Sequence, residues 1–258
     1  MLETQGFVNL HGVFQRVQSI QPHDDIGMRF TLDHPDIFLT QLRAMLRANA
    51  GLHNLRVLFP MITTVEEVDE ALRLLEHAHR ELEEDGRPAA RPQVGVMIEV
   101  PSAAWQAAQL ARRADFLSVG TNDLTQYLLA VDRDNARVAG LYDNLHPAVL
   151  KTIAHIVEGG RQAGRPVNLC GEMSADPGAA ILLLGMGADS LSAGATSVPR
   201  VKWAIRSFTR ARAQELARQA LELDTVGQIH RLLNDALRQA GLGEIVYERP
   251  GPRCSFDR

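Results

Sequence analysis

The sequence predicts an α/β fold built on a parallel sheet. Two features carry this prediction: short apolar runs alternate with longer helical patterns, and several runs end in a single polar residue. The runs are continuous and rich in β-forming residues, as expected of strands buried on both faces of a parallel sheet. They span residues 55–61, 94–99, 115–120, 166–170 and 189–193.

The helical patterns between and after these runs have recognisable ends. Residues 64–84 begin with Thr64, a favourable N-cap, and Glu66 and Glu67 follow in the first turn, where negative charge suits the helix dipole. Residues 147–164 begin with proline and end with glycine, the usual asymmetry of a helix. Further helices are expected at residues 176–185, 201–208, 210–223 and 226–240.

Repeated strand–helix units imply right-handed crossovers and a parallel sheet. In a (β/α)8 barrel the chemistry sits where strands end and loops begin, so the polar residues Glu99, Asp123 and Cys170 at or after the runs favour a barrel. The remaining strands of a complete barrel have only weak candidates, at residues 7–10 and 13–17. The predicted fold is therefore an incomplete (β/α)8 TIM-type barrel with its first strands missing, followed by C-terminal helices. An open doubly wound sheet is the alternative.

The composition of the 258 residues is that of a soluble globular protein, with 45% hydrophobic and 22% charged residues. The net charge of -4 disfavours nucleic acid as a partner. No apolar run approaches the roughly 18 to 20 residues of a membrane span, and the N-terminus lacks the pattern of a secretory signal. The two cysteines, Cys170 and Cys254, cannot form a disulfide framework, which indicates a cytoplasmic protein without a membrane partner.

Glu99 and Asp123 are candidate metal ligands. A carboxylate at the end of an apolar strand is costly to bury unless it is paired or bound to a metal. Two carboxylates on neighbouring strand ends can share one Mg2+, with water and substrate oxygens completing the octahedral shell. From their spacing alone, one of these two carboxylates could instead cap a helix and the other could form a salt bridge at the rim of the barrel.

Cys170 and Arg133 each allow a structural and a functional interpretation. A cysteine that ends a buried strand is often a small core residue, but Cys170 could also be an acid–base thiol, with Gly171 leaving room for a ligand. Arg133 offers a planar, permanently charged group suited to carboxylate or phosphate oxygens. Arg133 could equally well form a surface ion pair with Asp132 or Asp134.

Five segments, in chain order, form one specific pattern: residues 96–101, 116–127, 130–133, 169–173 and 183–187. Together they resemble enzyme I, the phosphoenolpyruvate-protein phosphotransferase of the bacterial phosphotransferase system. The similarity covers roughly residues 29–223. Residues 33–38 and 201–203 favour the nitrogen-related paralogue.

This resemblance implies a role for each candidate. Glu99 and Asp123 would hold Mg2+, Asn122 and Asp123 would bind the substrate phosphoenolpyruvate, with Asn122 at its phosphate, and Arg133 would offset the charge that moves in phosphoryl transfer. Cys170 would protonate the enolate of pyruvate that remains. The acceptor would be a histidine on a separate domain or carrier protein.

Two departures from the family pattern stand out. The chain has no room for the histidine domain and looks truncated at its N-terminus, where family members deliver substrate-binding arginines. Ile26 stands where the family has one such arginine, and Arg29 matches a neighbouring, less direct one. A catalytically impaired remnant, acting only in dimerisation or metabolite sensing, is therefore an alternative. A barrel like that of pyruvate-phosphate dikinase or phosphoenolpyruvate synthase is another.

The expected domain organisation follows the resemblance. Residues 1–25 form an atypical N-terminal segment, 26–223 a partial phosphoenolpyruvate-binding barrel domain, and 224–258 a C-terminal helix and tail. Because members of the family dimerise through this domain, a homodimer is expected.

Overall fold

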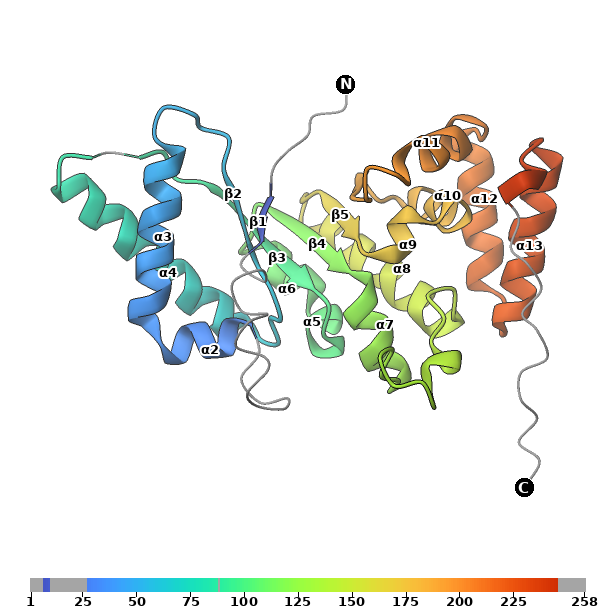
Figure 1. Ribbon diagram of the computed structural model, residues 1–258, viewed down its shortest axis with the longest axis horizontal. Helices are drawn as coiled ribbons and strands as arrows, with labels where there is room; N and C mark the ends of the chain where they lie inside the picture. Colours follow the sequence, from blue (N-terminus) through green and yellow to red (C-terminus); the bar gives the residue numbers. More distant parts are fainter. Residues whose placement is uncertain (1–6, 10–26, 88, 246–258) are drawn as a thin grey trace. The chain divides into compact units, whose positions relative to one another are not determined.

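The computed structural model describes residues 7–9, 27–87 and 89–245, which belong to two compact units. The first unit comprises the chain up to Val119 together with residues 158–167, and the second comprises residues 120–157 and the chain from Asn168 onward. Figure 1 labels most of the helices and strands of both.

The first unit is built on parallel strands that pair in sequence order. Val57 lies opposite Val94, and Val96 lies opposite Leu117, so β-branched and aliphatic side chains face one another across the strands. These side chains are buried, as the continuous apolar runs predict. The strands are β1 (Phe7–Asn9), β2 (Arg56–Phe59), β3 (Gln93–Ile98) and β4 (Phe116–Gly120).

The helices of the first unit bury an apolar stripe. In α3, Phe38, Leu42 and Leu46 recur every four residues and are fully buried, and the helix packs against α4. Thr64 caps α4 as predicted: its hydroxyl accepts a hydrogen bond from the N–H of Glu67, whose carboxylate returns the contact. The helices are α2 (Met28–Asp33), α3 (Pro35–Asn49), α4 (Val65–Glu84), α5 (Pro101–Trp105) and α6 (Ala107–Ala111).

The second unit contains two short parallel strands and the helices from residue 121 onward, except that one helix, Pro147–Gln162, continues into the first unit from Glu158. Strand β5 (Val167–Cys170) pairs with β6 (Ser190–Leu191), and the side chain of Asn168 accepts a hydrogen bond from the Ser190 hydroxyl at 3.0 Å. The helices are α7 (Thr121–Leu129), η1 (Ala139–Leu141), α8 (Pro147–Gln162), α9 (Glu172–Ala175), α10 (Pro177–Met186), α11 (Val198–Arg206), α12 (Arg210–Leu221), α13 (Val226–Gln239) and η2 (Gly243–Ile245).

Helix α10 forms the core of the second unit. Its residues from Pro177 to Leu183 are all buried, and it packs against α11, α12 and α13. In Figure 1, α11 and α12 lie next to it and α13 lies beyond α12. Asp176 caps its N-terminus by accepting a hydrogen bond from the N–H of Ala179 at 2.7 Å. Gly187 closes the helix in a left-handed conformation, two residues beyond the predicted end at Gly185.

The predicted elements agree closely with the observed ones. Each predicted apolar run contains a strand, and each predicted helix begins and ends within about three residues of its observed bounds. The weak strand candidate at residues 7–10 is confirmed by β1, whereas residues 13–17, Ile26 and the C-terminal tail with Cys254 lie outside the described residues.

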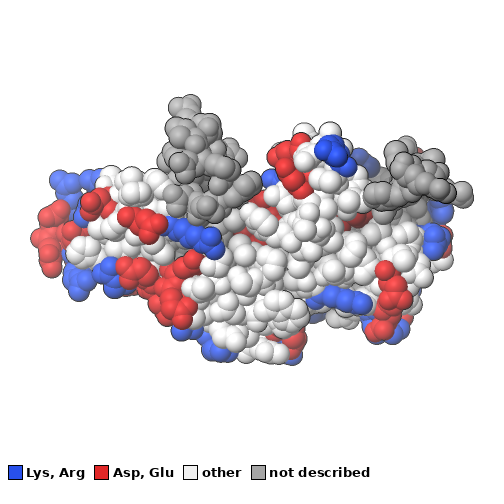
Figure 2. All heavy atoms as spheres, turned by 90° about the horizontal axis from the view of Figure 1, so that it is seen from below, with Lys and Arg blue, Asp and Glu red and all other residues white. Residues whose placement is uncertain are grey.

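The charges of the described surface are mixed. On the face seen in Figure 2, acidic and basic side chains lie beside one another in small groups separated by other residues. Several are neighbours on one helix, such as Arg73 with Glu70 and Arg218 with Glu215. Within the described part of the chain, no helix is long and apolar enough to cross a membrane.

Candidate functional site

Glu99 lies in the first unit, directly after β3. Its side chain is only 2% exposed and accepts a hydrogen bond from the N–H of Met61 at 2.7 Å. Met61 follows β2 and has a φ of 54°, which is uncommon for a residue other than glycine. A buried carboxylate held by a backbone N–H has a fixed position at the carboxyl end of its strand.

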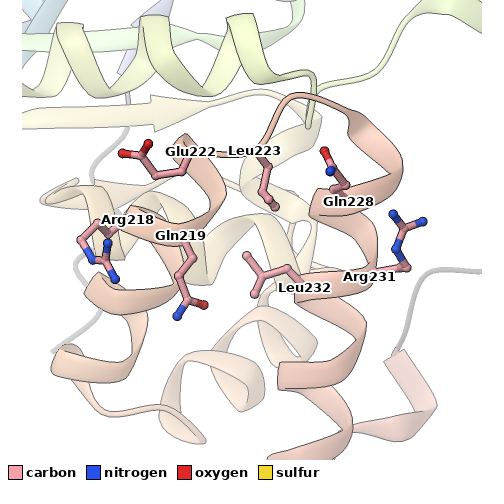
Figure 3. Close-up of a pocket in the computed structure, with 7 residues that line it drawn as sticks. All are labelled: Arg218, Gln219, Glu222, Leu223, Gln228, Arg231 and Leu232. Carbon is pink, nitrogen blue, oxygen red and sulfur yellow. The ribbon is translucent and has the colours of Figure 1, made fainter.

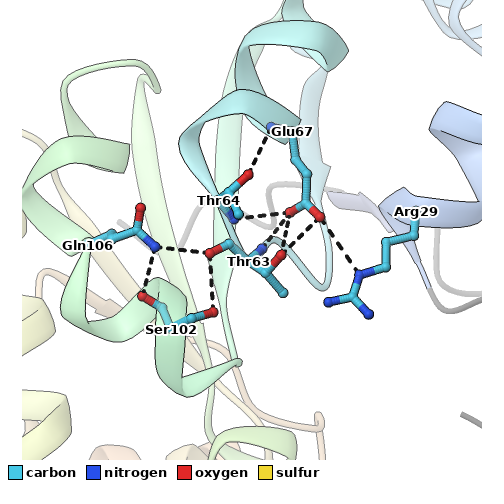
Figure 4. Close-up of polar contacts among 6 residues, drawn as sticks. All are labelled: Arg29, Thr63, Thr64, Glu67, Ser102 and Gln106. Atoms are coloured by element: carbon cyan, nitrogen blue, oxygen red, sulfur yellow. Dashed lines mark hydrogen bonds and ion pairs between the residues drawn. The ribbon is translucent and has the colours of Figure 1, made fainter. Parts of the chain in front are cut away.

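The loop after β2 is held by a network of polar contacts (Figure 4). The Glu67 carboxylate accepts hydrogen bonds from the N–H groups of Thr63 and Thr64 at 2.6 and 3.1 Å. The carbonyl of Thr63 accepts further bonds from Ser102 and Gln106 at 3.1 and 3.0 Å. This network makes the strand end beside Glu99 rigid in the first unit.

Arg29, on α2, contacts the same network through Glu67. Its Nε lies 3.8 Å from Oε1 of Glu67, and its side chain is 51% exposed. An exposed pair of this kind contributes little stability. Ile26, the position expected to have lost an arginine, lies outside the described residues.

Asn122 and Asp123 lie in the second unit, in the first turn of α7. The Asn122 side-chain oxygen accepts a hydrogen bond from the N–H of Glu172 at 2.9 Å, and the Thr121 hydroxyl donates to the carbonyl of Cys170 at 2.7 Å. These two bonds join the start of α7 to the end of β5. The N–H groups and the dipole at the start of a helix favour an anionic group nearby.

Cys170 ends β5 and is partly exposed, unlike the three buried residues before it. Gly171, which follows, has φ 97° and ψ -176°, a region that only glycine occupies readily. A Cβ on Gly171 would also collide with the Thr121 hydroxyl and would lie 2.7 Å from the Asn122 side-chain oxygen. Glycine is thus required here both for its backbone conformation and for space.

Arg133 contacts Asp123, and not the neighbouring aspartates that the sequence also offered. Its Nη2 lies 3.7 Å from Oδ1 of Asp123, with 37% and 26% of the two side chains exposed. Asp132 instead accepts a hydrogen bond from the N–H of Asp134 at 2.9 Å. The structure therefore brings Asn122, Asp123, Arg133 and Cys170 together in the second unit through contacts at α7 and β5. The roles of these residues and of Glu99 stay predictions.

Described residues of the second unit line an open groove and a more polar cavity. An open groove of about 490 Å³ between α12 and α13 contains none of the predicted site residues (Figure 3). Its lining residues are Arg218, Gln219, Glu222, Leu223, Gln228, Arg231 and Leu232. A more polar cavity of about 320 Å³ is lined by Tyr142, Glu172 and His230, among others, and is therefore adjacent to Asn122 through Tyr142 and Glu172.

Glu99 in the first unit and Asp123 in the second each carry an oxygen donor of a kind that suits Mg2+. Over residues 7–9, 27–87 and 89–245, no three His, Cys, Asp or Glu side chains form a cluster that could hold a metal alone. Mg2+ does not need such a cluster, because one or two carboxylates with water and substrate phosphate oxygens commonly complete its shell. The buried carboxylate of Glu99 and the half-buried one of Asp123 are oxygen donors of this kind.

Parallel strands covered by helices define an α/β domain, a class in which ligands bind at the carboxyl ends of the strands. A solved citrate lyase from Burkholderia xenovorans LB400 has a similar fold, with a TM-score of 0.50 and 19% identity over 82% of this chain and 70% of that chain. This likeness confirms the predicted TIM-barrel-like α/β fold, and the parallel strands are consistent with an incomplete barrel.

The chain belongs to the family described as PEP-utilising enzyme, PEP-binding domain, which matches residues 26–210. Proteins named "Phosphoenolpyruvate-dependent phosphotransferase system" from Salmonella typhimurium and Escherichia coli K12 are 48% and 47% identical over 221 residues. A "Phosphoenolpyruvate-protein phosphotransferase" from Haemophilus influenzae is 45% identical over 217 residues. These comparisons confirm the resemblance to phosphoenolpyruvate-protein phosphotransferases that the sequence motifs indicate.

The chain is much shorter than these relatives. The matches cover 84% to 85% of this chain but only 30% of the Salmonella and Escherichia proteins and 38% of the Haemophilus protein.

Several residues of the site were not found from the sequence. Thr121, Tyr142 and Met61 contact the predicted residues through hydrogen bonds that involve backbone groups. Such bonds leave little trace in composition or spacing. Only Thr121 could have been found from its position in the sequence, because it lies between a buried strand and Asn122.

Proposed function

We propose that the chain is a phosphoenolpyruvate-protein phosphotransferase module. It transfers the phosphoryl group of phosphoenolpyruvate, in a Mg2+-dependent reaction, to a histidine on a separate domain or carrier protein and releases pyruvate. The observation that carries this proposal is the group at the start of α7: Asn122 and Asp123 in the first turn, with Arg133 beside Asp123. Membership of the phosphoenolpyruvate-binding family supplies the substrate. A cytoplasmic location is part of the proposal.

Asn122 and Arg133 are the proposed groups for the phosphate. The Asn122 side-chain oxygen is engaged by the N–H of Glu172, which directs its amide NH2 group away from that bond and leaves it able to donate to a phosphate oxygen. The Arg133 guanidinium lies 3.7 Å from the partly exposed Asp123, so a substrate anion can share it at small cost. Positioning and charge stabilisation are the main contributions of a protein to phosphoryl transfer.

Glu99 and Asp123 are the residues proposed to hold Mg2+. When bound, the metal would offset the negative charge of the phosphate and carboxylate oxygens of the substrate. Glu99 contributes a carboxylate fixed by Met61 N–H, and Asp123 contributes one that Arg133 holds.

Cys170 is the proposed acid that completes the reaction. Loss of the phosphoryl group leaves the enolate of pyruvate, and transfer of the thiol proton to its methylene carbon gives pyruvate and a thiolate. The thiol is partly exposed at the end of β5, next to a glycine that leaves space for a ligand.

Replacing Cys170 with serine is expected to slow proton exchange between pyruvate and solvent roughly 100-fold or more, because general acid–base catalysis contributes about that much and a hydroxyl is a far weaker acid. Binding of phosphoenolpyruvate should change little. Exchange is measured by NMR of pyruvate in deuterated water, and binding by calorimetry. Cys254→Ser, which removes the other thiol, is the control; equal exchange rates in both variants would remove Cys170 from the mechanism.

The proposed function is tested by adding a separately produced histidine domain of a relative, labelled phosphoenolpyruvate and Mg2+. Phosphohistidine on the added domain supports the proposal. If the folded chain binds phosphoenolpyruvate but no phosphohistidine forms with any acceptor domain supplied, the chain is a binding module and the transferase proposal fails.

A homodimer is part of the proposal, and it rests on the family rather than on a contact in the structure. Light scattering of the purified chain is expected to give twice the mass of one chain over a wide range of concentrations. A well-behaved monomer at the highest concentration would contradict it.

A further inference from the structure

Thr121, the first residue of α7, makes a polar contact that the proposed mechanism does not use. The residue is fully buried, and its hydroxyl donates a hydrogen bond to the main-chain carbonyl of Cys170 at 2.7 Å. A hydroxyl is costly to bury without a partner, and a bond of this length is well formed. The contact therefore joins α7 to the last residue of β5 at a defined place.

The main chain of Cys170 is held on both sides of its Cα. Before the Cα, the carbonyl of Leu169 accepts a hydrogen bond from the N–H of Ser192 at 2.8 Å. After it, the carbonyl of Cys170 accepts the bond from Thr121. Because peptide groups are planar, fixing the two that flank a Cα sets its φ and ψ and the direction of its Cα–Cβ bond. These two bonds therefore determine where the thiol of Cys170 starts from the strand.

The residue after Cys170 makes the bond from Thr121 necessary. Gly171 has a permissive backbone, so it does not by itself restrain the peptide group that joins it to Cys170. Beyond it, the N–H of Glu172 donates to the side chain of Asn122 at 2.9 Å. Thr121 and Asn122 are consecutive residues of α7, and they hold the chain on the two sides of the glycine.

The first turn of α7 thus locates two groups that act on different parts of the substrate. Asn122 is the proposed contact of the phosphate, and Cys170 is the proposed acid for the methylene carbon. A proton is transferred only when the acid lies within reach of the accepting atom, and a misplacement of about 1 Å can lower a rate roughly 100-fold. The distance between the phosphate contact and the acid therefore has to be fixed.

We propose that Thr121 is a positioning residue of the phosphoenolpyruvate site, whose hydroxyl fixes the main chain of Cys170 and holds its thiol at a set distance from Asn122. The inference rests on the proposed function of this site and on the role of Cys170 as the acid. Thr121 is fully buried and does not touch the substrate; it acts through Cys170.

The test compares Thr121→Val, which keeps the shape of the side chain without its hydroxyl, with Thr125→Val in the full chain. Thr125 is also fully buried on α7, and its hydroxyl donates to the side chain of Asn144 at 3.0 Å, so each variant loses one buried hydrogen bond. With Mg2+ present, Thr121→Val should exchange the methyl protons of pyruvate with solvent at least roughly 10-fold more slowly, and Thr125→Val at the unchanged rate. Calorimetry should show similar phosphoenolpyruvate affinities in both. An unchanged exchange rate in Thr121→Val would overturn the inference.

Thr121→Ser distinguishes positioning from general structural support. Serine keeps the hydroxyl and loses only the methyl group, so proton exchange should return close to the rate of the unsubstituted chain even where the free energy of unfolding is lower. Exchange as slow as in Thr121→Val would show that the hydroxyl is not what matters, and would overturn the inference. If Thr121→Val does not fold, Thr121→Ala, which also lacks the hydroxyl, takes its place in the comparison.

A measurement without substrate separates this inference from the proposed function. In a chain that carries Cys254→Ser, Cys170 is the one cysteine left, so labelling with ¹³C-cysteine gives a single carbonyl and a single Cβ NMR signal. Both signals are expected to shift in Thr121→Val and to stay unchanged in Thr125→Val. If the unsubstituted chain binds no phosphoenolpyruvate and exchanges no pyruvate protons, the proposed function fails. Thr121 is then judged by these signals alone, and an unchanged Cβ signal in Thr121→Val overturns its positioning role.

Discussion

Replacing Asp123 with asparagine is expected to weaken Mg2+-dependent binding of phosphoenolpyruvate about 100-fold or more. Asparagine has nearly the same shape but lacks the charge that a hard cation requires. Loss of this carboxylate removes a proposed ligand of Mg2+, so the effect should far exceed that of losing an exposed ion pair. The measurement is a calorimetric titration with and without Mg2+. Asp123 is 26% exposed in its side chain, so the fold should tolerate the change.

Glu99→Gln, a change in the first unit, independently tests the proposed assignment of Mg2+ ligands. Glutamine keeps an oxygen that can accept the hydrogen bond from Met61 N–H, so the loop after β2 should stay in place. The expected result is the same loss of Mg2+-dependent binding as in Asp123→Asn.

The control for Asp123→Asn is Asp235→Asn, since Asp235 lies on α13 with 70% of its side chain exposed and pairs with Arg238 in its own helix. It should bind phosphoenolpyruvate like the unsubstituted chain. If Asp123→Asn also binds normally, the metal assignment is wrong. If no chain binds at all while remaining folded, the chain is a remnant and not an enzyme module.

The sequence predicted most of the fold because local and global signals agree here. The strand runs are buried on both faces and therefore continuous in apolarity, and Thr64 and Asp176 cap helices in the way their side chains predict. Helices α2 and α3 were not predicted, although the buried Phe38, Leu42 and Leu46 form a regular stripe. Pro35 is the first residue of α3, a favourable position for proline, and the stripe follows directly after it.

The candidate site was predictable only in part. Asn122, Asp123 and Cys170 follow strands, and strand ends on one edge of a parallel sheet are expected to carry chemistry. Arg133 and Tyr142 lie in the loop after α7, where no periodicity fixes their direction, and their partners are set by tertiary contacts. Spacing in the sequence could not show that Arg133 pairs with Asp123 and not with Asp132 or Asp134.

Gly171→Ala is expected to destabilise the second unit and to weaken phosphoenolpyruvate binding in one step. The backbone conformation of Gly171, with φ 97° and ψ -176°, costs a residue with a Cβ about 1–3 kcal/mol. The new Cβ would in addition collide with the hydroxyl of Thr121 and press on the side-chain oxygen of Asn122. Both residues would have to move, and Asn122 would lose its bond to the N–H of Glu172.

Gly241→Ala separates the two effects. Gly241 has a φ of 77°, but a Cβ there would meet no atom within 4 Å, so this variant carries backbone strain without a collision. Denaturant unfolding should show a loss of about 1 kcal/mol for Gly241→Ala and a larger loss for Gly171→Ala. Calorimetry should show reduced phosphoenolpyruvate affinity only for Gly171→Ala. Equal losses of stability and of phosphoenolpyruvate affinity in the two variants would mean that the first turn of α7 does not depend on the space at Gly171. The contacts of Thr121 and Asn122 would then not be what positions the site.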